Sequence, residues 1–448
     1  MEKPWEALQE LIRDGSPSDV IFFIDSMPPS EISRGISRLS EGERGQLFSM
    51  LPTQEAADLL EEIPDAQAAD LLEEMPPEDA AIIVDEIVSD ERVDILAEVD
   101  DEAAEQILDQ MEDDEAAEAR RLLTYPDDSA GGIMITEFLS YDQAMGLSSV
   151  LDDLRRRGDE IAEFNIQYIY VTGVRRELVG VLRLRDIVLK TSEGTVADAM
   201  VAGTVQVSVD TPLRDLREIF EHHAYVGVPV VDAGGVLVGV VVRDDLEAAL
   251  AELATEDFLK ASGIVDEELR SMPLMQRSFK RLSWLSVNVV LNLIAASIIA
   301  LNMETLEAAV ILAVFLPIIS DMSGCSGNQA VAVSIRELSL GFIDPRELAR
   351  VFGKEVSVGF INGALLGLLL GGVAWLWKGN PYLGAVVGLA LALNTVLAVV
   401  LGGALPLILR RFHKDPALAS GPILTTVTDL CGFLLVFLLA GPVLSQLS

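Results

Sequence analysis

The sequence has very few of the side chains on which most metalloenzymes and disulfide-bonded proteins depend. Its 448 residues include two cysteines and three histidines. Cys325 and Cys431 provide neither a disulfide framework nor the paired spacing of a zinc site. His222, His223 and His413 lack the spacing of a metal hydrolase, and neither a nucleophile elbow nor a phosphate-binding loop is found. We therefore expect a protein that is not an enzyme.

Basic residues are also scarce, and the shortage is confined to one part of the chain. There are 32 Lys and Arg residues against 71 Asp and Glu, a formal charge of −39. From Arg281 onward nine basic and nine acidic residues balance, which leaves 23 basic and 62 acidic residues in the first 280. Such a surface repels nucleic acid and attracts divalent cations. We expect no nucleic-acid partner; a merely solvated acidic surface is the alternative to cation binding.

The C-terminal part contains five long apolar runs. A helix needs roughly 20 residues to cross about 30 Å of hydrocarbon, and every run exceeds that length. The runs are Leu282–Met303, Ala308–Ile335, Val356–Trp377, Tyr382–Leu409 and Pro416–Ser448. We therefore predict a transmembrane domain of five helices at 281–448, embedded in a lipid bilayer.

The basic residues of this part predict its orientation. Lys and Arg gather before the first run, between the second and third, and between the fourth and fifth. Because basic loops favour the cytoplasmic side, we expect a multi-pass plasma-membrane protein with a cytoplasmic N-terminus and an external C-terminus. The first residues, MEKPWEALQELIRDG, lack the features of a signal peptide.

Two carboxylates interrupt the apolar runs, which contain no Lys, Arg or His. Asp321 and Asp429 are these two acids. A charge at membrane depth costs about 2.5 to 3.5 kcal/mol and normally faces water or a partner. We interpret both as cation sites on an aqueous path; a protonated or snorkelling carboxyl is the alternative. Pro317, Gly324 and Gly327, close to Asp321, predict a loosened or kinked helix there.

The acidic part begins with a short internal repeat. Residues 56–111 contain AADLLEEIP, AADLLEEMP, AAIIVDEI and AAEQILDQM, with a period of 12 in the first three. Prolines at the unit ends exclude a continuous coiled coil and favour a stack of short helices. We assign residues 1–124 to an all-α N domain, whose outer acids are expected mostly to form a solvated face.

A second repeat has a longer period, in which Gly180 corresponds to Gly239. IYVTGVRRELVGVLRLRDIV, from Ile169, matches VPVVDAGGVLVGVVVRDDLE, from Val228, and each unit predicts strand, turn, strand and helix. The pair resembles tandem CBS domains, at 125–192 and 193–250. Such pairs often bind ATP or another adenine nucleotide, and Asp186 and Asp245 match the position that contacts ribose. A ligand-free pair remains the alternative.

Three further motifs extend the resemblance to the whole chain. YPDDSAGGIM, LPIISDMSGCSGNQA and DPALASGPILTTVTD together resemble the MgtE family of magnesium channels and transporters. The resemblance implies a multidomain membrane protein: a helical-repeat N domain, an α/β CBS pair, a long connecting helix at 251–280 and five transmembrane helices. It also implies a homodimer that takes up Mg²⁺ through a central pore lined by the second and fifth runs.

The resemblance assigns roles to several residues of the two polar runs. Asp429 would hold hydrated Mg²⁺, and Thr425 would lend a backbone carbonyl. Asn328 and Gln329 match the motif of the second run, and Asp321 is a further pore candidate from its position. Since Mg²⁺ keeps several of its waters, one or two carboxylates with carbonyls suit it.

Members of the family also sense Mg²⁺ in the cytoplasm, where ions bridging acidic residues close the pore. The matching acids in this chain are Asp90, Asp94, Asp210, Asp245, Glu256 and Asp257. Two departures leave selectivity and sensing open. Cys325 occupies a position at which the second-run motif of the family often has Asn. Asp321 occupies a position at which some members of the family have a neutral residue. Ala224 replaces an acid that some sensors use.

Two other functions compete with a Mg²⁺-gated Mg²⁺ channel. A secondary carrier would couple divalent-cation movement to Na⁺ or H⁺, with Asp321 as the coupling site. A membrane-anchored nucleotide or ion sensor would have no pore, and its activity would not depend on Asp429.

Overall fold

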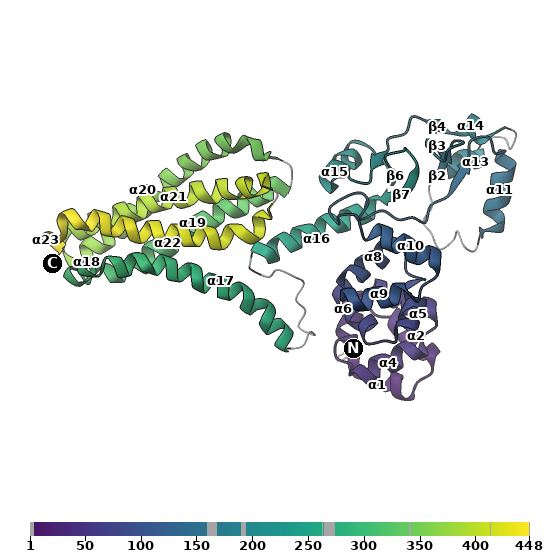
Figure 1. The fold of residues 1–448 in the computed structure, drawn as a ribbon, viewed down its shortest axis with the longest axis horizontal. Coiled ribbons are helices and arrows are strands. Elements are labelled where there is room, and N and C mark those ends of the chain that lie inside the picture. The colour runs from purple at the N-terminus through teal and green to yellow at the C-terminus, as the bar shows by residue number, and fades with distance from the viewer. Residues whose placement is uncertain are drawn as a thin grey trace. The chain divides into compact units, whose positions relative to one another are not determined.

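The computed structural model describes residues 4 to 447 except 159–167, 190–193, 262, 264–273, 340, 341 and 413 (Figure 1). The chain forms two compact units. The acidic unit extends to Glu252, and the membrane unit begins at Leu253.

The acidic unit begins with a stack of short helices. These are α1 (Pro4–Asp14), α2 (Pro17–Asp25), α3 (Pro29–Ile36), α4 (Glu41–Met50), α5 (Thr53–Glu61), α6 (Asp65–Glu73), α7 (Pro77–Val84), α8 (Ser89–Glu98), α9 (Asp101–Leu108) and α10 (Asp113–Leu122). From α2 onward the helices begin at an unvarying interval, which equals the period of the short sequence repeat. The predicted repeat is confirmed, and it extends beyond 56–111 in both directions.

Proline and buried aliphatic residues explain this periodicity. Pro52, Pro64 and Pro76 precede α5, α6 and α7 in extended backbone. A proline at this position cannot continue the preceding helix. It is tolerated at the start of the next helix, because the first amides of a helix have no hydrogen-bond partner within that helix. The apolar face of each helix then packs into one continuous core, to which α5 contributes Leu59 and α6 contributes Leu71.

Two small sheets follow, one for each unit of the longer repeat. The elements are β1 (Ser140–Asp142), α11 (Leu147–Arg156), β2 (Tyr168–Thr172), β3 (Leu178–Arg183), α13 (Leu184–Leu189), α14 (Val196–Ala199), β4 (Val201–Ala202), β5 (Val207–Ser208), α15 (Leu213–His222), β6 (Gly227–Val231), β7 (Leu237–Val242) and α16 (Arg243–Ala261). The strand orders are β1-β2-β3-β4 and β5-β6-β7. In both sheets the first strand is parallel to its neighbour and the next pair is antiparallel.

The strand register confirms the longer repeat. Gly180 pairs with Val171 and Gly239 with Val230, and in each sheet the register shifts directly after that pair. The motif that begins at Tyr125 adds to the second sheet, because Ile135 and Val240 exchange backbone hydrogen bonds of 2.9 Å. Residues at the start of the predicted first CBS domain therefore pack on the second.

The membrane unit is a bundle of long helices. They are α17 (Leu274–Leu301), α19 (Leu312–Ser339), α20 (Leu348–Lys378), α21 (Pro381–Arg411) and α22 (Pro416–Ala440), with short α18 (Met303–Ala308) and α23 (Leu444–Leu447). Within the residues that the structure describes, four stretches are long and apolar enough to span a membrane: Arg277–Leu301, Pro345–Lys378, Pro381–Arg411 and Gly421–Leu447. Helix α19 is long enough, but its polar residues 320–329 lower its hydropathy. Its membrane crossing stays a prediction.

Helix α21 forms the centre of the bundle and packs against α19, α20 and α22 (Figure 1). Its contact with α20 uses small residues four positions apart, because Gly363 and Gly367 approach the backbones of Ala392 and Gly388. Close backbone approach of this kind holds helices together where no hydrophobic effect drives them. Of the polar part of α19, only Ser323, Gly324 and Gly327 are buried against neighbouring helices.

The second run is not broken at Pro317, because α19 is one continuous helix through that residue; a kink there stays a prediction. The glycines of α19 serve close packing. A Cβ on Gly327 would lie 3.0 Å from the carbonyl oxygen of Ala398 and 2.8 Å from a methyl of Leu424. The glycine lets α21 and α22 approach this face of α19.

The predicted connecting segment 251–280 contains the end of α16 and the start of α17. Between them Gly263 has a φ of +86° and donates its amide to Lys260 O at 2.9 Å. This left-handed conformation favours glycine and ends a helix. The predicted connecting helix at 251–280 is therefore interrupted at Gly263.

Candidate functional site

The membrane unit holds the carboxylate of Asp429 between two helices. Asp429 lies in α22 and is half-buried, and the hydroxyl of Ser320 on α19 donates a hydrogen bond to its Oδ1. Ser320 directly precedes Asp321, whose side chain is exposed on this chain and whose charge acts on Asp429. The structure thus brings both predicted acids of the apolar runs close together.

A pocket on the same unit joins two other predicted pore residues. Asn328 of α19 and Thr425 of α22 both line a cavity of about 380 Å³, together with Asn288 and Trp284 of α17. Asn328 and Thr425 have exposed side chains, as do Gln329 and Cys325. Amide and backbone oxygens at such a surface are suited to bonding the waters of a hydrated cation.

The carbonyl expected to face the ion already accepts a side-chain hydrogen bond. Thr428 Oγ1 donates to Thr425 O at 3.0 Å, while Thr425 Oγ1 donates to Gly421 O at 3.0 Å. A carbonyl oxygen has two lone pairs, and the helix itself uses one. For Thr425 O to bond a hydrated ion, the Thr428 hydroxyl would have to turn away.

In the acidic unit, carboxylates gather on one face of α8. Asp90, Glu91 and Asp94 occupy positions i, i+1 and i+4, which share one side of a helix. Asp90 interacts electrostatically with Asp245 of α16, and Asp94 with Asp65 of α6. We call Asp65, Asp90, Glu91, Asp94 and Asp245 the α8 acid cluster.

Burial and mutual repulsion shift the titration of this cluster. Burial first, and then the charge of Asp245, raise the pKa of Asp90 to about 7. Burial with the charge of Asp90 raises the pKa of Glu91 to about 8, and burial with Asp65 raises the pKa of Asp94 to about 8. Burial also raises the pKa of Asp245. With these pKa values, Asp90, Glu91 and Asp94 are partly protonated near neutral pH.

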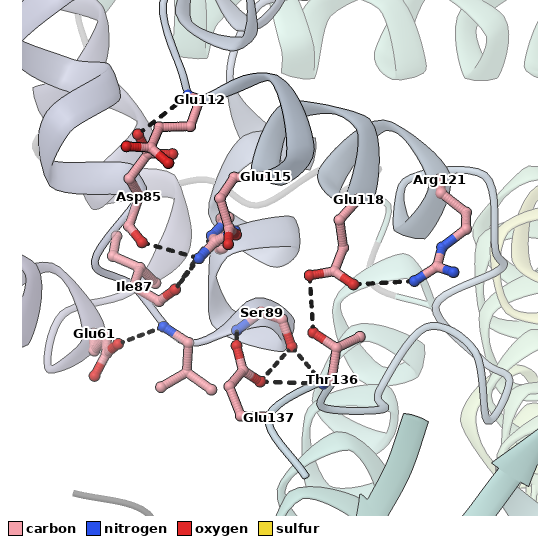
Figure 2. A network of polar contacts seen from close by, with 12 residues as sticks. Glu61, Asp85, Ile87, Ser89, Glu112, Glu115, Glu118, Arg121, Thr136 and Glu137 are labelled. Atoms are coloured by element: carbon pink, nitrogen blue, oxygen red, sulfur yellow. Dashed lines mark hydrogen bonds and ion pairs between the residues drawn. The ribbon is translucent and has the colours of Figure 1, made fainter. Parts of the chain in front are cut away.

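A hydrogen-bond network fixes the start of α8. Figure 2 shows Ser89, whose hydroxyl donates to the carboxylate of Glu137 at 2.8 Å and accepts the amide of Thr136 at 2.9 Å. The amide of Val88 donates to Glu61 at 3.0 Å. The bonds of Ser89 join the helical stack to residues 136 and 137, which precede the first sheet.

A buried arginine completes the same junction. Arg92 is 4% exposed, forms an ion pair with Glu115, and donates to the carbonyls of Asp85 and Ile87 at 3.1 and 2.9 Å. The Arg92 guanidinium therefore binds α10 and the turn that precedes α8. Asp90 Oδ1 is buried, and among the residues that the structure describes it has no hydrogen-bond partner.

The other predicted sensor residues lie elsewhere. Asp210 is exposed in the turn after β5. Glu256, in the membrane unit, forms an ion pair with Lys260, whose Nζ also lies 3.5 Å from Asp415. The side chain of Asp257 falls outside the described residues. Within the described parts of the chain, no three His, Cys, Asp or Glu side chains converge closely enough to hold a metal ion.

A pocket of about 590 Å³ lies between the two CBS-like units. It is lined by Tyr168, Arg183, Leu184, Arg185, His223, Ala224 and Tyr225. The rings of His223 and Tyr225 stack with centroids 4.8 Å apart. Asp186 directly follows this lining and lies 3.5 Å from Arg185, whereas Asp245 belongs to the α8 acid cluster instead. Aromatic faces with two guanidinium groups suit a flat base and an anion.

Sequence reasoning missed Ser320, Glu91 and Asn394. Asn394 of α21 is fully buried and donates from Nδ2 to Thr428 O at 3.1 Å. A signal was present for each. Ser320 opens the polar stretch, Glu91 lies between two chosen acids, and Asn394 with Thr395 forms a polar pair inside an apolar run.

Comparison with known families gives three matches along the chain. Residues 316–439 match the MgtE divalent cation transporters, residues 27–128 the MgtE intracellular N domain, and residues 196–252 the CBS domain. These ranges fall on α19 to α22 of the bundle, on α3 to α10 of the helical stack and on the second sheet.

Individual relatives agree with these matches. A magnesium transporter MgtE of Enterococcus faecalis is 33% identical over 327 residues, which are 73% of this chain and 72% of that protein. The Thermus thermophilus protein of the same name is 36% identical over 324 residues, 71% of either chain. A crystal structure of the soluble part of a magnesium transporter superposes with a TM-score of 0.50 at 28% identity, covering 56% of this chain and 99% of that one.

Proposed function

The chain belongs to the MgtE family of magnesium transporters, and we propose that it conducts Mg²⁺ through a pore in which Asp429 binds the ion. One observation carries this proposal: Asp429 lies in an apolar helix and is held by the neutral hydroxyl of Ser320, in runs that contain no Lys, Arg or His. A carboxylate without a counter-charge at that depth requires a cation or water.

Mg²⁺ suits this arrangement because it gives up its waters reluctantly. The ion would keep part of its hydration shell, and Asp429 would supply charge while the amide of Asn328 and the carbonyl of Thr425 bond the waters. Two chains related by a two-fold axis would place two Asp429 carboxylates around one dication. The exposed apolar side chains of α17, such as Leu285, Val289 and Leu293, would then face lipid or the second chain.

The α8 acid cluster would provide gating by cytosolic Mg²⁺. Its carboxylates repel one another, and Asp90, Glu91 and Asp94 are partly protonated near neutral pH. A dication would displace those protons and draw α8 and α16 together through Asp90, Asp94 and Asp245. Asp210, Glu256 and Asp257 would join through movement of the chain, closing the pore when cytosolic Mg²⁺ is high.

An adenine nucleotide fits the larger pocket of the acidic unit. Tyr168, His223 and Tyr225 offer ring faces for a base, while Arg183 and Arg185 would pair with phosphates. Asp186 would reach the ribose from its place beside Arg185. We propose ATP or a related nucleotide as the ligand, and a plasma-membrane protein whose acidic unit and N-terminus are cytoplasmic and whose C-terminus is external.

Growth of a bacterial strain that lacks Mg²⁺ uptake tests the pore. The wild-type chain and the control Ser323→Ala should restore growth at low Mg²⁺, and Asp429→Ala should not. Full rescue by Asp429→Ala would overturn the pore assignment. A carrier predicts instead that Asp321→Asn fails and that flux in vesicles follows an imposed Na⁺ or pH gradient.

A further inference from the structure

Helix α21 presents one buried amide to the helix that carries Asp429. Asn394 is 0% exposed, and its Nδ2 donates to the carbonyl oxygen of Thr428 at 3.1 Å. Thr428 is also fully buried. The orientation of the amide follows from chemistry, because the opposite orientation would set two oxygens against each other.

This contact acts on the peptide group from which Asp429 extends. The carbonyl of Thr428 and the amide N–H of Asp429 belong to one planar unit. Fixing the carbonyl therefore fixes the direction in which the Asp429 backbone, and with it the side chain, leaves α22. Ser320 holds the other end of the same residue through its carboxylate.

The close fit between α21 and α22 at this point depends on Gly432. A Cβ on Gly432 would lie 2.8 Å from Nδ2 of Asn394, less than van der Waals contact. Glycine leaves room for the amide one turn beyond the carbonyl that it bonds. Asn394 Oδ1 is buried and, over the described chain, without a hydrogen-bond partner. An unpaired buried acceptor costs stability, so packing alone does not account for an asparagine here.

We propose that Asn394 is a positioning residue that sets the α22 backbone beside Asp429 and thereby contributes to Mg²⁺ affinity. The inference rests on the proposed function, since it assumes that Asp429 binds the transported ion. Asn394 itself does not touch the ion.

Thr395 offers a matched control. It follows Asn394 on the same helix and is equally buried, and within the described residues its hydroxyl has no hydrogen-bond partner. Thr395→Ala makes a small cavity in α21 without removing the bond to Thr428. Asn394→Ala makes a similar cavity and does remove it.

The test measures Mg²⁺ uptake by full-length protein in liposomes as a function of Mg²⁺ concentration. Asn394→Ala should raise the half-saturating concentration by up to about tenfold, the limit reached when the whole of one buried hydrogen bond acts on ion binding, with a smaller change in maximal rate. Thr395→Ala should leave it unchanged. Equal shifts in both variants, or wild-type affinity in Asn394→Ala, would overturn the inference.

Gly432→Ala gives a second route that keeps the amide. Its Cβ should displace Asn394 and raise the half-saturating concentration by a similar factor. The double variant Asn394→Ala/Gly432→Ala should match Asn394→Ala alone, because the amide that would clash is gone. If Asn394→Ala does not accumulate, Gly432→Ala decides: a raised concentration supports the inference and a wild-type one overturns it.

Asp429→Ala, assayed in parallel, separates this inference from the proposed function. If Asp429→Ala transports like the wild type, the pore assignment fails and the positioning role fails with it. If Asp429→Ala is inactive while Asn394→Ala and Gly432→Ala both keep wild-type affinity, only the positioning role is wrong.

Discussion

In the acidic unit, Asp90, Glu91 and Asp94 lie together on α8 among further carboxylates, whereas in the membrane unit Asp429 is held by the neutral hydroxyl of Ser320. In the first arrangement, carboxylates of like charge repel one another, so that their ionisation depends on pH and on bound cations. The second is fixed by a hydrogen bond between two packed helices. A site of the first kind changes shape when an ion arrives, and a site of the second kind keeps its shape as ions pass. The comparison therefore favours our proposal that the acidic unit senses Mg²⁺ and that the membrane unit selects it.

Neutralising the cluster should give the largest effect. Asp90→Asn/Asp94→Asn removes the repulsion that Mg²⁺ would relieve, so the full-length protein should be more stable without Mg²⁺ and gain little from added Mg²⁺. Each kcal/mol gained would raise the melting temperature by about 2–4 °C. Thermal unfolding with and without about 10 mM Mg²⁺, a concentration above weak divalent sites, measures this. The control Asp113→Asn/Asp114→Asn removes two acids at the start of α10. If the Asp90/Asp94 variant kept the full wild-type response to Mg²⁺, the sensor would lie elsewhere.

The stability of the acidic unit should depend on pH in the absence of Mg²⁺. The pKa values of Asp90, Glu91 and Asp94 are raised to about 7, 8 and 8, above the values of an unfolded chain. Their protonated forms therefore favour the folded state. That stabilisation is complete below about pH 4 and is lost as the pH rises through 7 and 8.

The measurement compares melting temperatures at about pH 6 and about pH 9. Wild type should lose more stability over this range than Asp90→Asn/Asp94→Asn, and saturating Mg²⁺ should remove the difference. Parallel curves for the two proteins without Mg²⁺ would contradict the raised pKa values.

Removing the hydroxyl at Ser320 tests the opposite kind of site. Ser320→Ala takes away the donor to Asp429 and should weaken Mg²⁺ uptake by about threefold to tenfold, the usual net contribution of one side-chain hydrogen bond. Uptake should keep its maximal rate at high Mg²⁺. Ser323→Ala is the matched control, because Ser323 donates within its own helix to Ile319 O. Equal effects from the two would indicate general damage to α19.

The smallest effect is expected at the end of α16. Lys260 pairs with Glu256 and lies 3.5 Å from Asp415, and such partly exposed ion pairs contribute about 0–1 kcal/mol. Lys260→Met should speed proteolysis near Glu256 by at most about fivefold at low Mg²⁺. Lys354→Met removes a charge elsewhere in the membrane unit and should not change it. Unaltered cleavage in Lys260→Met would show that this pair does not hold the helix.

The sequence predicts periodic features well, and contacts between helices poorly. The short helical repeat and the longer repeat of the two sheets follow from proline positions and alternating apolar residues, so both were predictable. The continuity of α19 through Pro317 was not, because neighbouring helices cover its glycines. Contacts such as Ser320 with Asp429, or Asn394 with Thr428, join residues far apart in the sequence. They depend on which helix faces are adjacent, and composition does not encode that.

Mg²⁺ flux into liposomes that contain the full-length protein tests the central comparison most directly. We predict that Asp429→Asn abolishes flux at every Mg²⁺ concentration, while Asp90→Asn/Asp94→Asn conducts like the wild type at low Mg²⁺ and is no longer inhibited when Mg²⁺ on the side of the acidic unit is raised to about 10 mM, a concentration above weak divalent sites. Wild-type flux through Asp429→Asn, or full inhibition of the cluster variant, would contradict the division of selection and sensing between the two units.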